Sequence, residues 1–203
     1  MSVERGRRRP LTLPHHQTPE RPAPAREGVR ALRGPLRILG IDPGTLRLGY
    51  GVVESGGAAG AGVRYVECGV ITAPARAPRA ARLTEIGRGL REILQELAPD
   101  VVAMEEVFFG KNLQSTLALG EARGVALLVA GEAGLTVAGY PPATVKQAVV
   151  GHGRASKDQV AFLVRAVLSM RRVPSADAAD ALAIAICHAR RAAAPRALRS
   201  RAR

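Results

Sequence analysis

Apolar residues along the chain follow two kinds of spacing. Short apolar runs occupy 37–42, 50–54 and 63–72, and turn-forming residues at 43–44 and 55–62 separate them. This pattern predicts three strands joined as an antiparallel meander. The next segment has the i, i+3, i+4, i+7 spacing of an amphipathic helix, which predicts a helix over 81–97 that Pro99 ends. Its apolar positions are Leu83, Ile86, Leu90, Ile93, Leu94 and Leu97.

The rest of the chain alternates between the two patterns. We expect a strand over 100–107, a long apolar helix over 113–133 and a strand over 135–140. From Ala143 onward the pattern is helical, with Ser156 and Ser175 as candidate N-caps for two helices. The order of three strands, helix, strand, helix, strand and two helices predicts an α/β fold. It would be a five-stranded mixed sheet, its first three strands antiparallel, with helices on both faces.

Positive charge is concentrated at the two ends of the 203-residue chain, whose net charge is +13. Residues 1–35 carry a net +5 and residues 188–203 a net +6, which leaves only +2 for the middle. Such ends are typical of segments that bind nucleic acid. They also fit a compositional bias, because the chain has 27 Arg and only 3 Lys. Both interpretations remain open at this stage.

Composition also divides the chain into three parts. Residues 1–35 hold six of the 14 prolines and little apolar periodicity, which predicts a disordered basic extension. We expect a folded domain over 36–190 and a disordered basic tail over 191–203. The two cysteines, Cys68 and Cys187, indicate neither a disulfide framework nor a cysteine zinc site. With no signal-peptide pattern and no run of about 18 apolar residues, we expect a cytoplasmic protein.

Carboxylates stand at the ends of several predicted elements. Asp42 ends the first strand, where an unpaired buried acid would cost several kcal/mol. Glu105 and Glu106 end the strand over 100–107, and because neighbouring side chains in a strand point to opposite faces, only one of them can face Asp42. Asp177 and Asp180 share one face of the last helix. Acids in a first helical turn also complement the helix dipole, so this pair alone does not identify a site.

If these acids meet in space, their mutual repulsion requires a cation. Carboxylate oxygens suit Mg²⁺ or Mn²⁺, and paired metals can activate water for attack on a phosphodiester. The pattern therefore indicates metal-dependent phosphoryl chemistry.

Several segments together resemble the RuvC family of bacterial Holliday-junction resolvases, within the ribonuclease H-like superfamily. The resemblance covers about 36–190 in the same order and spacing, through "ILGIDPG", "GYGVVE", "MEEVFFGKN", "LGEARGVALL", "VKQAVVGHGRASKDQV" and "ADAADALAIAICH". It implies a ribonuclease H-like fold. It also implies that the metal-binding and catalytic acids are Asp42, Glu105 rather than Glu106, Asp177 and Asp180.

The resemblance assigns roles to further residues. It implies that Lys146 and Lys157 lie near the scissile phosphate as catalytic and DNA-binding residues. Phe108 would contact unpaired bases at the junction centre, although paired aromatics such as Phe108 and Phe109 are also common in cores. Lys111 and Asn112, in the same segment, are expected to bind DNA. Two positions depart from the pattern: Leu48 replaces a hydroxyl residue that many relatives carry, and the basic N-terminal extension is unusual.

The function that the resemblance implies is a Mg²⁺-dependent endonuclease that resolves four-way DNA junctions in recombination and repair. It would make paired symmetric nicks that leave 5′-phosphates, with two Mg²⁺ per subunit and Mn²⁺ as a substitute. A two-fold symmetric junction requires two related active sites, so we expect a homodimer, with the helix over 113–133 in its interface. The expected protein partners are RuvA and RuvB.

Two other interpretations stay open. "GIDPGT" also resembles the first phosphate loop of actin-like and sugar-kinase ATP-binding domains, although the chain shows no second DxG loop and no adenosine-binding segment. A catalytically inactive junction-binding protein would keep the fold and the basic ends. Single histidines such as His152 and His188 are more often structural than catalytic, and the sequence does not decide whether either touches the site.

Overall fold

Five strands form one mixed sheet in the computed structural model, which describes residues 35–56, 62–106 and 113–193. Its elements all belong to the unit that spans 32–203. The strand order is β3-β2-β1-β4-β5, in which the first three strands along the chain are antiparallel and β1, β4 and β5 are parallel. The predicted mixed sheet is therefore confirmed. The strands are β1 Leu36–Asp42, β2 Arg47–Ser55, β3 Val63–Thr72, β4 Val101–Glu105 and β5 Thr136–Tyr140.

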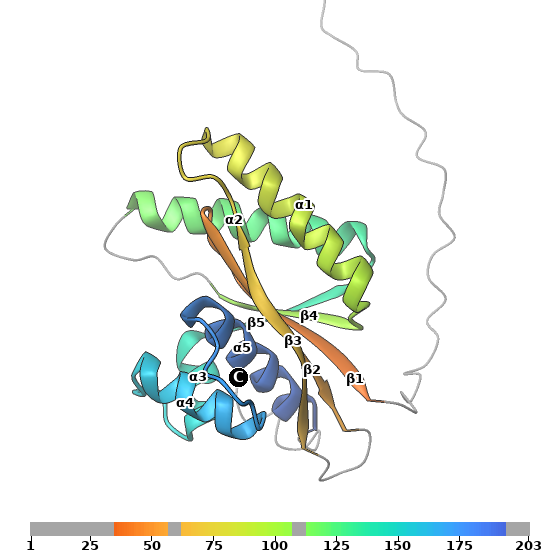
Figure 1. Ribbon diagram of the computed structural model, residues 1–203, viewed down its shortest axis with the longest axis vertical. Helices are drawn as coiled ribbons and strands as arrows, with labels where there is room; N and C mark the ends of the chain where they lie inside the picture. The colour runs from red at the N-terminus through yellow and green to blue at the C-terminus, as the bar shows by residue number, and fades with distance from the viewer. Residues whose placement is uncertain (1–34, 57–61, 107–112, 194–203) are drawn as a thin grey trace, which may run out of the picture. The chain divides into compact units, whose positions relative to one another are not determined.

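Helices cover both faces of this sheet, as Figure 1 shows: α1 and α2 lie on one side, and α3, α4 and α5 on the other. Three helices follow β5 where the sequence predicted two. The prediction missed a break at Gly151, whose φ of 90° ends α3. The helices are α1 Arg79–Leu97, α2 Leu113–Glu132, α3 Pro142–Val150, α4 Lys157–Val167 and α5 Ala176–Ala193, so α5 runs three residues past the expected domain end at 190.

The two-residue period of β1 separates the two cores. Ile38 belongs to the core under α3, α4 and α5, whereas Leu39 and Ile41 belong to the core under α1 and α2. Because side chains alternate along a strand, Asp42 lies on the same face as Ile38. The first acid therefore points toward the side of the sheet that α5 covers.

Helix α5 lies unusually close to β1 and β2. A Cβ at Gly40 would lie 2.0 Å from the carbonyl oxygen of Ala181, and one at Gly49 would lie 2.1 Å from that of Asp177. Only glycine leaves room for such an approach, and most residues that α5 buries are alanines. This packing brings the first turn of α5 to the end of β1, where Asp42 stands.

Leu48 has a structural explanation. Its side chain is fully buried in the core under α1 and α2, which is the face of the sheet opposite to Asp42. The departure from the family pattern therefore adds apolar packing behind the sheet and leaves the acidic edge untouched.

Two further findings bear on the sequence predictions. Cys68 and Cys187 are both free thiols, and Cys187 is buried. Among the residues that the structure describes, no helix has the length and apolar character needed to cross a membrane.

Candidate active site

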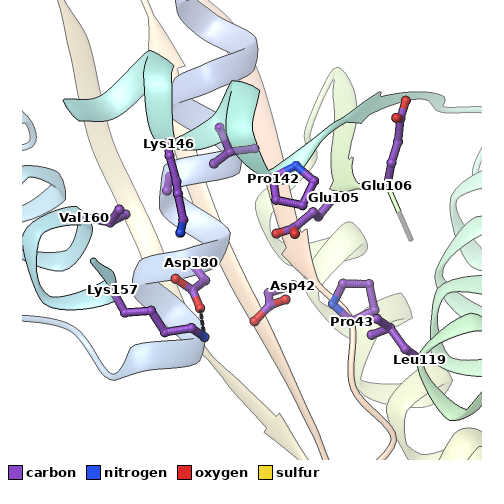
Figure 2. A pocket seen from close by; sticks show the side chains of 12 residues that line it. Asp42, Pro43, Glu105, Glu106, Leu119, Pro142, Lys146, Lys157, Val160 and Asp180 are labelled. Carbon is purple, nitrogen blue, oxygen red and sulfur yellow. Dashed lines mark hydrogen bonds and ion pairs between the residues drawn. The ribbon is translucent and has the colours of Figure 1, made fainter. Parts of the chain in front are cut away.

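Two acids meet at one edge of the sheet because of strand register. Ile41 of β1 pairs with Met104 of the parallel strand β4, so Asp42 and Glu105 follow side by side. In β4, Val101 and Ala103 belong to the core under α5, so the alternation places Glu105 on that face and Glu106 on the other. Figure 2 shows Glu105 directed toward Asp42 and Glu106 directed away from it.

A pocket of about 310 Å³ opens at this edge. Helix α3 contributes Lys146, the first residue of α4 is Lys157, and α5 contributes Asp180. The pocket thus gathers three of the four expected acids and both expected lysines around one space (Figure 2). Its remaining lining residues are Pro43, Glu106, Leu119, Pro142, Val145, Val160 and Ala183.

Lys157 is held in this pocket by the start of its helix. The Ser156 hydroxyl accepts a hydrogen bond from the backbone N–H of Gln159 at 3.2 Å, and the Gln159 side chain accepts one from Ser156 N–H at 2.9 Å. This capping box begins α4 at Lys157, as Ser156 predicted. Lys157 Nζ then lies 3.0 Å from Asp180 Oδ2, and that hydrogen bond raises the pKa of Lys157.

Asp177 lies beside the pocket without lining it. Its Oδ2 accepts a hydrogen bond from Nε of Arg47, the first residue of β2, at 2.6 Å. Asp177 is still near enough to Asp42 for its negative charge to raise the pKa of Asp42. Sequence reasoning did not find Arg47, because nothing local in the chain links it to an aspartate 130 residues away.

The two strand-end acids are costly to ionise. Burial, followed by the charges of Asp180 and Glu105, raises the pKa of Asp42 from its ordinary value of 3.8 to about 7. Burial and the charge of Asp180 also raise the pKa of Glu105, which the nearby lysines only partly oppose. The positive side chains of the protein therefore do not fully neutralise the carboxylates at this edge of the sheet.

The acid set matches a hard divalent cation in chemistry. Within 35–56, 62–106 and 113–193, no three His, Cys, Asp or Glu side chains are grouped closely enough to be ready metal ligands. Two of the four acids are instead in ion pairs, Asp180 with Lys157 and Asp177 with Arg47. The donors are nonetheless all carboxylate oxygens, the ligands that Mg²⁺ and Mn²⁺ prefer, and this edge already attracts positive side chains. The residues therefore fit such an ion.

The histidines lie apart from this chemistry. His188 Nδ1 is 2.8 Å from the hydroxyl of Tyr140, and burial lowers the pKa of His188. His152 is exposed. Neither residue lines the pocket. Of the other expected site residues, Phe108, Lys111 and Asn112 lie outside the residues that the structure describes.

The strand order, the helices on both faces and the acidic pocket at the ends of β1 and β4 define a nuclease domain of the ribonuclease H-like class. The family model "Crossover junction endodeoxyribonuclease RuvC" matches residues 38–188. The chain belongs to the RuvC family.

Curated relatives agree with this assignment. A crossover junction endodeoxyribonuclease RuvC from Chloroflexus aggregans is 52% identical over 155 residues, which cover 76% of this chain and 93% of that protein. One from Azorhizobium caulinodans is 49% identical over 156 residues, which cover 77% and 90%. The resemblance noted from the sequence motifs is confirmed, and the interpretation of "GIDPGT" as an ATP-binding loop is not supported.

Solved structures agree as well. Thermus thermophilus RuvC in complex with a Holliday-junction substrate superposes with a TM-score of 0.72 at 39% identity, covering 78% of this chain and 95% of that one. The yeast mitochondrial Holliday-junction resolvase Ydc2 has a TM-score of 0.55 at 15% identity, covering 77% and 79%, which bears on the fold alone.

Proposed function

We propose that this chain resolves four-way DNA junctions by paired, symmetric, metal-dependent nicks that leave 5′-phosphates, in recombination and repair. One observation carries the proposal: in a chain of the RuvC family, Asp42, Glu105 and Asp180 share a pocket with two lysines. The solved complex of the Thermus relative with a Holliday junction supports the choice of substrate.

The acids Asp42, Glu105, Asp177 and Asp180 would hold the metal, with two Mg²⁺ per subunit and Mn²⁺ able to substitute. Bound there, Mg²⁺ supplies activation of a water molecule and stabilisation of the leaving oxygen. The raised pKa values of Asp42 and Glu105 support the assignment, because a cation would relieve the repulsion that causes part of each shift.

The two lysines act on the phosphate. The ammonium groups of Lys146 and Lys157 face the space between the acids (Figure 2), where they would oppose the negative charge that builds up on the phosphate in the transition state. Lys157 adds its charge to the positive end of the α4 dipole. On the other side, Pro43 and Leu119 give the pocket an apolar wall.

A homodimer would supply the second active site that a two-fold symmetric junction requires. Helix α2 supports this assignment because it leaves large apolar side chains exposed: Leu113 at 73%, and Leu117 and Leu128 at 59% each. Its buried residues are mostly alanines that face the sheet. We therefore propose α2 as a dimer contact.

Most of the remaining assignments come from the family, and that of the basic ends comes from their charge. Phe108 would stack on an unpaired base at the junction centre, a contact worth about 1–3 kcal/mol, while Lys111 and Asn112 would bind DNA nearby. RuvA and RuvB would deliver the junction in the cytoplasm. The basic ends, 1–35 and 188–203, would add contacts to the DNA backbone that are independent of sequence.

The test is cleavage of a synthetic four-way junction with a homologous core, in Mg²⁺, Mn²⁺ or Ca²⁺. We expect paired nicks that ligase can seal in Mg²⁺ and Mn²⁺, none with Asp42→Asn or Glu105→Gln, and cleavage retained with Glu106→Gln, whose side chain points away. Cleavage by Asp42→Asn at the parent rate would disprove the metal assignment. Junction binding in EDTA, with no nicking in either metal, would instead identify a catalytically inactive binding protein.

A further inference from the structure

Arg47 and Asp177 form an ion pair at the margin of the pocket. Nε of Arg47 donates to Oδ2 of Asp177 at 2.6 Å. Because Asp177 is one of the four acids assigned to the metal, its carboxylate has two competing partners, a guanidinium and a divalent cation. The pair therefore bears on how the site takes up metal.

The backbone around Arg47 explains why its side chain reaches Asp177. A Cβ at Gly44 would lie 2.2 Å from the carbonyl oxygen of Arg47, so the turn between β1 and β2 is tight. Residues 47, 49 and 51 share one face of β2. A Cβ at Gly49 would lie 2.1 Å from the carbonyl oxygen of Asp177, which shows that the first turn of α5 rests directly on this face. Arg47 is thus held next to Asp177.

The ion pair between Arg47 and Asp177 is weak enough to be broken by a competing cation. The Arg47 side chain is 55% exposed and the Asp177 side chain 33% exposed, so water weakens their attraction. A divalent cation beside several carboxylates attracts Asp177 with twice the charge of a guanidinium. The ion pair can therefore form without metal and yield to it.

We propose that Arg47 is a positioning residue that holds Asp177 outside the pocket in the metal-free protein and releases it as a divalent cation binds. The inference rests on the proposed function, because it takes the acids as metal ligands. Since the cation has to displace a guanidinium, Arg47 lowers the affinity of the site for metal. Arg47 would thereby set the metal concentration at which the site becomes loaded.

The first test compares the full chain with Arg47→Gln without DNA, by thermal unfolding across a titration with Mg²⁺. We expect Arg47→Gln to reach half of the Mg²⁺-dependent rise in unfolding temperature at a Mg²⁺ concentration about two- to fivefold lower than the parent does. At 1.4 kcal/mol per tenfold, this corresponds to a gain of about 0.4–1 kcal/mol in metal-binding free energy. The matched control, Arg91→Gln, breaks another exposed ion pair, Arg91 with Glu132, which joins α1 to α2 on the opposite side of the sheet from α5 and lies outside the pocket lining. It should leave the metal response unchanged.

The second test follows the ion pair itself. The Nε–H signal of Arg47 in a ¹⁵N spectrum can be assigned by its loss in Arg47→Gln. Without metal this proton should exchange slowly with water, and the protection should disappear as Mg²⁺ is added, at the same Mg²⁺ concentration as the rise in unfolding temperature. If the signal is unchanged at saturating Mg²⁺, the proposal is overturned, because any gain in affinity is then a general effect of charge. Equal or weaker metal binding by Arg47→Gln overturns it as well.

These outcomes separate this inference from the proposed function. If the parent protein shows no metal-dependent rise at all, the metal assignment and the role of Arg47 fail together. If the parent responds to Mg²⁺ and Arg47→Gln responds at the same concentration, only the role of Arg47 fails.

Discussion

Replacing Asp42 by Asn should abolish cleavage and yet stabilise the metal-free protein. Asp42 ends a buried strand, and its pKa is raised to about 7 by burial and by the charges of Asp180 and Glu105. Above that pH the folded protein carries a carboxylate that water would solvate better in the unfolded chain. Asn keeps the shape of the side chain and removes this charge.

The size of the effect follows from the two pKa values. Below the unfolded pKa of 3.8, Asp42 is protonated in both states and costs nothing. As the pH rises toward 7 the unfolded chain loses the proton first, so the folded state becomes progressively less stable, and above about 7 the cost is constant. A difference of about three pH units at 1.36 kcal/mol each gives an upper bound of about 4 kcal/mol. We expect Asp42→Asn to gain about 1–4 kcal/mol at pH 8.

The assay is urea unfolding in EDTA at pH 4, 6 and 8, with the parent, Asp42→Asn and Glu132→Gln. Near pH 4 the parent and Asp42→Asn should converge, and at pH 8 Asp42→Asn should be the more stable. Glu132→Gln serves as the control, since losing its exposed ion pair with Arg91, which lies outside the pocket lining, should cost about 0–1 kcal/mol instead. Added Mg²⁺ should stabilise the parent and reduce the advantage of Asp42→Asn.

Two results would refute this reasoning. If Asp42→Asn is no more stable than the parent at pH 8 in EDTA, the buried charge carries no cost. If its advantage is the same at pH 4 as at pH 8, the gain comes from packing and not from ionisation.

Other changes test the fold and the interface. Gly40→Ala should lower the free energy of unfolding by about 1–3 kcal/mol and impair cleavage, because its Cβ would lie 2.0 Å from the carbonyl oxygen of Ala181 and push α5 away. As a control, Gly131→Ala in α2, where the new Cβ meets open space, should raise the free energy of unfolding by up to about 1 kcal/mol in the same urea assay. Glu54→Gln should cost about 1–3 kcal/mol at pH 7, because two arginines hold the buried Glu54 carboxylate and lower its pKa below 4.5. That difference should shrink as the pH falls below 4.5, which urea unfolding at pH 7 and pH 3 measures. Leu128→Glu should weaken the proposed dimer, seen as a larger monomer fraction by sedimentation with unchanged secondary structure; an unchanged monomer fraction would argue against α2 as the contact.

The four acids of the site differ in their ion pairing. The acids of α5 are paired with cations from β2 and α4, whereas Asp42 and Glu105 at the strand ends are not in ion pairs within the described residues. If the four acids hold the metal as proposed, a cation would relieve the cost of the strand-end acids and would have to replace the ion pairs of the acids of α5. The proposed metal affinity would then depend on the balance of these two effects.

The sequence alone determined the features that depend on neighbours along the chain. Strand and helix periods predicted the order of elements up to β5, and the two-residue period predicted that only one of Glu105 and Glu106 could face Asp42. The capping residue Ser156 placed the start of α4 and therefore Lys157. These features are local, so the pattern of residues is enough to define them.

Only the tertiary structure decided the features that depend on distance across the fold. The register between β1 and β4 set Asp42 beside Glu105, and glycines in β1 and β2 set how closely α5 approaches. The pairing of Arg47 with Asp177 joins residues 130 apart. Contacts of this kind arise from the packing of whole elements, because each depends on the backbone positions of both partners, and no local spacing in the chain encodes them.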